Sequence, residues 1–117
     1  MTAGARTPEE LDTLLEDAFV LRDRAASGAL FDDAAVLMDA PRGLEARGGE
    51  AIGRALADLW ARNCLYVAGG RRVLQTGDTA LIVAEAGIHV VQRGSDRAWR
   101  AAISLLDLEV TTRPEDT

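Results

Sequence analysis

The chain has 117 residues, which is enough for one domain but not for two. Its 19 acidic and 13 basic residues give a net charge of −6, which argues against nucleic acid binding, because phosphate recognition needs a concentrated basic surface. A single cysteine cannot form an internal disulfide and fits a reducing compartment. With only one histidine beside it, we predict neither a metal site nor a cofactor.

The N-terminal residues are polar and acidic, unlike a signal peptide, and no stretch approaches the roughly 20 apolar residues of a membrane span. We therefore expect a cytoplasmic protein that does not contact membranes. A single α+β domain is predicted at residues 8–110, between flexible termini at 1–7 and 111–117.

The first half of the chain has helical signals. Thr7, Pro8 and Glu10 form an N-terminal helix cap, and a helix over about 8–26 follows, with an apolar stripe made by Leu11, Leu14, Leu15, Ala18 and Phe19. We then expect a short helical turn near 29–33, a brief strand at 35–38 and a second helix at about 49–63.

From Cys64 onward the apolar period becomes strand-like. We predict strands at 65–75, 79–92 and 99–108, with turns at 77–78 and 93–96. In the strand at 79–92 both faces are largely apolar, and His89 lies on the face opposite Ile88. Helices can cover one face only, so we predict a homodimer that packs through its sheets.

Three segments in this order resemble the nuclear transport factor 2-like superfamily, which includes ketosteroid isomerases and SnoaL-type cyclases. They are ALFDDAAVLMD at 29–39, GGEAI at 48–52 and RGSDRAWR at 93–100. The resemblance implies a cystatin-like fold, in which a cone-shaped, curved antiparallel sheet wraps around N-terminal helices and a pocket for a small apolar molecule. Family members usually have a further hairpin, which the uninterrupted stretch 79–92 would lack.

The resemblance makes Asp39 the candidate catalytic residue, because it follows the same short strand as the general base of the isomerases. A carboxylate beside an apolar pocket suits proton abstraction next to a carbonyl group. The alternative is a loop aspartate that stabilises the turn before Pro41. The isomerases also use two oxyanion donors, and the matching positions, Leu15 and Ile88, cannot donate a hydrogen bond.

The candidate ligand-binding residues are the large side chains expected around the cone: Phe19, Met38, Trp60, Tyr66 and His89. Each has a structural alternative, since large side chains in such positions also fill cores, and His89 could lie in the dimer face rather than shuttle protons. Three functions stay open. They are an isomerase, cyclase or dehydratase with Asp39 as base, a non-catalytic module that binds a lipophilic ligand, and a dimerisation domain with a filled cone.

Overall fold

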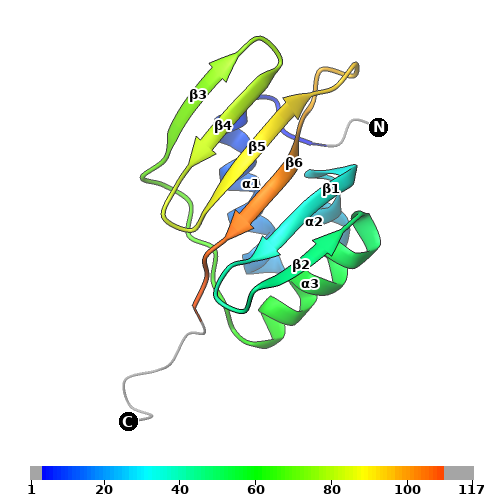
Figure 1. Ribbon diagram of the computed structural model, residues 1–117, viewed down its shortest axis with the longest axis vertical. Coiled ribbons are helices and arrows are strands. Elements are labelled where there is room, and N and C mark those ends of the chain that lie inside the picture. The colour runs from blue at the N-terminus through cyan, green and yellow to red at the C-terminus, as the bar shows by residue number, and fades with distance from the viewer. Residues whose placement is uncertain (1–3, 110–117) are drawn as a thin grey trace.

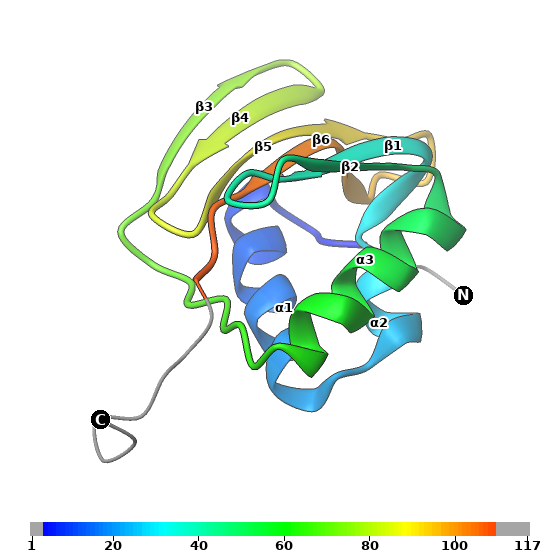
Figure 2. The same ribbon diagram turned by 60° about the horizontal axis from the view of Figure 1, so that its bottom comes forward.

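Three helices pack against one face of a curved six-stranded sheet in the computed structural model, which describes residues 4–109 (Figures 1 and 2). The helices are α1 (Pro8–Leu21), α2 (Arg24–Gly28) and α3 (Gly49–Ala61). The strands are β1 (Phe31–Asp39), β2 (Leu44–Arg47), β3 (Arg72–Thr76), β4 (Thr79–Val83), β5 (Gly87–Arg93) and β6 (Trp99–Leu106). Their order across the sheet is β2-β1-β6-β5-β4-β3.

Helix α1 begins where its sequence predicts but ends earlier. The Glu10 N–H donates to the Thr7 hydroxyl at 3.1 Å, which is the predicted cap. The helix stops at Leu21 because Arg22 has a left-handed φ of 51°. Asp23 then caps α2, since its side chain accepts from the Ala26 N–H at 3.0 Å. The single helix predicted over 8–26 is therefore two helices.

Strand pairing corrects three sequence predictions in the sheet and adds one strand. The predicted helical turn at 29–33 is wrong from Phe31 onward, because β1 begins there and pairs with β6. This pairing is parallel, so the sheet is mixed rather than wholly antiparallel. Strand β2, which pairs antiparallel with β1, was not predicted. The predicted strand at 65–75 is regular only from Arg72, where it pairs with β4.

The stretch 79–92 is not continuous but forms the hairpin β4–β5. Residues 84–86 turn the chain, and the Ala84 N–H donates to the Gly87 carbonyl at 2.9 Å. The hairpin that seemed to be missing is therefore present. A Cβ at Gly87 would lie 2.5 Å from the Leu105 carbonyl oxygen, so only glycine fits this close approach. The turn also changes which residues share a face, because Ile82 pairs with His89 on the helix side.

The outer face of the sheet is apolar across five strands. Backbone pairing aligns one row of Leu74, Leu81, Val90, Ile103 and Val36, and a second row of Val83, Ile88, Leu105 and Met38. Leu74 is 67% exposed and Ile103 is 53% exposed. The inner face instead packs on the helices, with Leu15, Leu37, Leu56 and Ile82 fully buried. Over residues 4–109, all helices lie on the inner face of the sheet.

The folded body includes part of the N-terminal segment that was predicted to be flexible. Ala5 is buried and bridges Trp99, with backbone hydrogen bonds of 2.7 and 3.0 Å. Residues 1–3 and the segment predicted to be flexible at 111–117 lie outside the described residues. Over the described part of the chain, none of the helices has the length and apolar character needed to cross a membrane.

Candidate functional site

A chain of buried polar side chains crosses the interior between α1 and the sheet. The Tyr66 hydroxyl contacts the Asp12 carboxylate and lies 2.9 Å from Nε2 of His89. Nδ1 of His89 lies 2.7 Å from the Ser104 hydroxyl on the neighbouring strand. Asp12, His89 and Ser104 are each no more than 1% exposed. All four side chains therefore depend on one another for their hydrogen bonds.

The direction of these hydrogen bonds follows from Asp12. An ionised carboxylate only accepts, so Tyr66 donates its hydroxyl proton to Asp12. The Tyr66 oxygen can then accept from Nε2–H of His89, and Nδ1 accepts the Ser104 hydroxyl. Every donor in this hydrogen-bond network thus points toward Asp12, and His89 is neutral with its proton on Nε2.

Burial sets the ionisation of this network. Burial lowers the pKa of His89 to about 4, which the Asp12 charge only partly opposes. Burial, and then the hydrogen bond to Asp12, raises the pKa of Tyr66 above its ordinary value. At neutral pH the histidine and the tyrosine are both uncharged, and the network ends at the Asp12 carboxylate, which pairs with Arg71.

Asp12 also holds an irregular segment against α1 by hydrogen bonds. This segment comprises residues 64–71, and we call it the strap. The second carboxylate oxygen of Asp12 accepts from the Gly69 N–H at 3.2 Å and lies 3.2 Å from the Arg71 guanidinium. One helical turn later, Glu16 accepts from the Ala68 N–H at 3.1 Å. These bonds hold a segment without helix or strand structure in one position beside the sheet.

Aromatic side chains pack next to this network in the interior. Phe19 lies edge-on to Trp60 at a ring-centroid distance of 5.9 Å and contacts Tyr66 at 5.8 Å, and Tyr66 lies 6.0 Å from His89. Four of the five residues proposed to line a pocket thus meet in a packed cluster. Met38 lies apart from them, on the outer face of the sheet.

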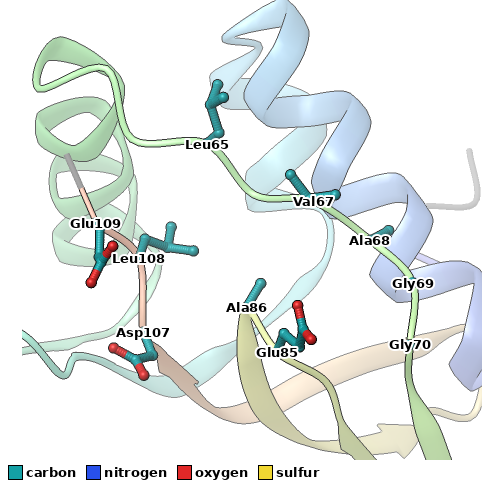
Figure 3. A pocket seen from close by; sticks show the side chains of 10 residues that line it. All are labelled: Leu65, Val67, Ala68, Gly69, Gly70, Glu85, Ala86, Asp107, Leu108 and Glu109. Carbon is teal, nitrogen blue, oxygen red and sulfur yellow. The ribbon is translucent and has the colours of Figure 1, made fainter. Parts of the chain in front are cut away.

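A pocket of about 440 Å3 opens at one end of the cone, between the strap, the β4–β5 turn and the residues after β6 (Figure 3). We call it the mouth pocket. Its apolar lining includes Leu65 and Val67, which are 57% and 63% exposed, together with Ala86 and Leu108. Three carboxylates, those of Glu85, Asp107 and Glu109, complete the lining, and its described residues include no basic side chain.

Asp39 lies elsewhere, at the end of β1 and on the helix side of the sheet. Oδ2 of its carboxylate is 2.7 Å from Nε of Arg42, and its side chain is 6% exposed. Arg42 also reaches the Cys64 sulfur at 3.7 Å. Asp39 lines a groove between β2 and α3 rather than the mouth pocket. Its role as a catalytic base stays a prediction.

Sequence reasoning missed Asp12, Ser104 and Arg71. The signal for Asp12 was present, because it lies three residues before Leu15 and seven before Phe19, on the apolar stripe of α1. A carboxylate on such a stripe is buried by the fold, so it needs hydrogen-bonding or oppositely charged partners in the interior. Ser104 could not be found in this way, since only the β5–β6 register places it opposite His89. Ile88, at the position matched to an oxyanion donor, faces away from the interior. The neighbouring residue on β5 whose polar side chain faces the interior is His89.

Solved structures share this architecture over most of the chain. A protein of unknown function from Nostoc punctiforme, with a cystatin-like fold, has a TM-score of 0.72 at 14% identity and covers 91% of this chain and 90% of its own. A ketosteroid isomerase-like protein from Erwinia carotovora has a TM-score of 0.69 at 18% identity, covering 86% and 92%.

A nuclear transport factor 2-like protein from Novosphingobium aromaticivorans has a TM-score of 0.68 at 19% identity, covering 89% of this chain and 80% of its own. No family model and no curated protein matches the chain. The chain therefore has the cystatin-like, nuclear transport factor 2-like fold that its sequence resembles. At these identities the likeness extends to the fold and not to a reaction.

Among residues 4–109, no group of three or more histidine, cysteine, aspartate or glutamate side chains is arranged to hold a metal ion. The chemistry that the described residues offer is therefore a satisfied buried network, a mouth pocket with an acidic rim, and the separate groove beside Asp39.

Proposed function

We propose that this chain is a small-molecule-binding domain whose ligand occupies the mouth pocket and combines an apolar body with a positively charged end. The observation that carries this proposal is the lining of that pocket. Leu65 and Val67, each more than half exposed, line the concavity, and three carboxylates line it as well, without a basic side chain among the described lining residues.

Size and charge both favour such a ligand. A volume of about 440 Å3 is in the range of pockets that hold small metabolites. Covering Leu65 and Val67 removes apolar surface from water, which favours binding in proportion to the area buried. Glu85, Asp107 and Glu109 attract a cation, and the net charge of −6 adds to that attraction.

The buried network supports the proposal by fixing one wall of the pocket. Ala68 and Gly69 line it, and their backbone N–H groups donate to Glu16 and Asp12 on α1. A wall that is already held in place loses little conformational freedom when a ligand binds. The packed aromatic cluster does not line the mouth pocket, so a ligand fits there without displacing aromatic side chains.

The test is a titration of the 15N-labelled protein with hexylammonium, followed by NMR chemical shifts, with hexanoate as the probe of equal length and opposite charge. We expect saturable shifts at Val67, Gly70 and Glu85 with hexylammonium and much weaker ones with hexanoate. The double variant Glu85→Gln/Asp107→Asn should weaken binding at least tenfold. Glu50→Gln, an exposed acid on α3, is the control and should change nothing. Equal affinities for the two probes would refute the proposal.

We also propose that two copies of the chain pair through the outer face of the sheet. The support is the pair of aligned apolar rows, which place Leu74, Ile88 and Ile103 on one continuous surface. A concavity of about 370 Å3, bordered by Leu74, Leu81 and Val90, lies on this surface. A second copy presents the same surface and would remove both from water.

Analytical ultracentrifugation tests this pairing. We expect a dimer that Ile88→Lys converts to a monomer, because the substitution places a charge in the middle of an apolar row. Gln92→Lys is the matched control, since Gln92 is on the same strand in a row with Thr79 and Arg100. A wild-type protein that is monomeric at micromolar concentration would contradict the proposal.

A further inference from the structure

We infer that Asp39 forms a second ligand site, in the groove between β2 and α3, which takes a small neutral molecule with an apolar body and a hydroxyl or amide N–H donor. We call it the edge groove, because β2 is the edge strand of the sheet. It shares none of its described lining residues with the mouth pocket, so the inference does not depend on the proposed function.

The edge groove has room for such a molecule and an apolar floor. Its volume is about 400 Å3. Small side chains from both elements form the floor, namely those of Ala46 on β2 and of Ala51 and Ala55 on α3. Figure 1 shows α3 running alongside β2, and α3 contacts both β1 and β2. Three alanines here leave space that larger side chains would fill.

Asp39 supplies an unused hydrogen-bond acceptor at this groove. Its Oδ2 is engaged by Arg42 at 2.7 Å, whereas its Oδ1 is buried without a hydrogen-bond partner among the described residues. Buried carboxylate oxygens are normally satisfied, and an unsatisfied one is unfavourable. Asp39 lines the groove, and the proposed donor meets Oδ1, which is buried in the structure, when the carboxylate turns toward the ligand.

The charges around the edge groove favour a neutral ligand. Glu45 pairs with Arg47 at 2.6 Å, and Asp58 pairs with Arg62 at 3.0 Å. Asp39 itself is already paired with Arg42. Arg54, which also lines the groove, pairs with Glu50 at 3.8 Å, so either a cationic or an anionic ligand would compete with an existing ion pair. A hydroxyl or amide N–H can instead donate to Oδ1 while the ion pair with Arg42 stays intact.

Phenol and toluene are the probes that test this inference, because they have nearly the same shape and differ in one hydroxyl group. In 15N chemical-shift titrations we expect phenol to shift the amides of Ala46, Ala51 and Ala55 saturably, with toluene at least tenfold weaker. Ala55→Leu fills the floor without touching Asp39 and should weaken phenol binding at least tenfold. Ala61→Leu, an exposed position at the end of α3, is the matched control and should have no effect.

Asp39→Ala should make the phenol and toluene affinities equal, and circular dichroism will check that this variant is folded. Should it fail to fold, the comparison of Ala55→Leu with Ala61→Leu decides alone. Equal binding of phenol and toluene by the wild type would overturn the inference, as would shifts that leave the three alanine amides unmoved. Shifts confined to Val67 and Glu85 would overturn it while leaving the proposed function intact.

Discussion

Neutral His89 makes the stability of this protein dependent on pH in a defined window. The folded pKa is about 4, whereas an unfolded histidine titrates near 6.5. Between these values the unfolded chain binds a proton that the folded chain does not, so the free energy of unfolding falls as the pH decreases. For 2.5 pH units at about 1.4 kcal/mol each, the loss is roughly 3 kcal/mol between pH 7 and pH 4.

The substitution that isolates this effect is His89→Gln. Glutamine does not titrate, and its amide can still donate toward Tyr66, so the packing around the network changes little. We expect a lower stability at pH 7 but a shallower decline toward acid. Urea denaturation at half-unit steps from pH 7 to pH 5 measures both proteins before most carboxylates of the unfolded chain, with pKa values of about 4, take up protons.

The difference between the two curves is the decisive quantity, because carboxylates common to both proteins cancel. Over pH 6.5 to 5 the wild type should lose about 2 kcal/mol more than the variant. Parallel curves would refute the assignment of a neutral, buried His89. A wild-type stability that increases as the pH falls would show that the folded protein binds the proton more tightly, which is the opposite sign.

Three further substitutions test the rest of the account by urea denaturation. Tyr66→Phe should destabilise the fold by about 2–4 kcal/mol, because it leaves two buried atoms, Oδ1 of Asp12 and Nε2 of His89, without a hydrogen-bond partner, whereas no measurable loss would contradict the network. Gly87→Ala should cost about 1–3 kcal/mol, since its Cβ would strike the Leu105 carbonyl, and a neutral result would show that the strands can move apart. Thr7→Ala should cost about 1 kcal/mol through loss of the cap, and an unchanged midpoint would show that α1 does not need it.

Local signals predicted the parts of the fold that depend on neighbouring residues. The cap at Thr7, the start of α3 at Gly49 and the tight turn at Gly77 all follow from short-range chemistry, and the structure has each of them. The parallel pairing of β1 with β6 joins residues 67–70 positions apart, which no local pattern encodes. The turn at 84–86 was missed because two of its three residues are alanines, which continue an apolar strand pattern.

In the candidate site, too, some residues could be predicted from local sequence and others depend on long-range contacts. Phe19, Trp60, Tyr66 and His89 could be singled out by type, and the fold brings them together. Their partner Asp12 was missed although it lies on the apolar stripe of α1, and Ser104 looked like an ordinary polar position because its burial depends on tertiary contacts. The change of face across the β4–β5 turn likewise placed Ile88 on the outside, and only the strand register determines this.

The measurement that tests the central claim most directly is a set of intermolecular nuclear Overhauser effects between bound hexylammonium and methyl-labelled protein. The account predicts contacts from the alkyl chain to the methyl groups of Leu65, Val67 and Leu108 at the mouth pocket. Contacts to Leu74 and Ile88 on the outer face, or none to any methyl group at saturating probe, would show that the mouth of the cone is not a ligand site.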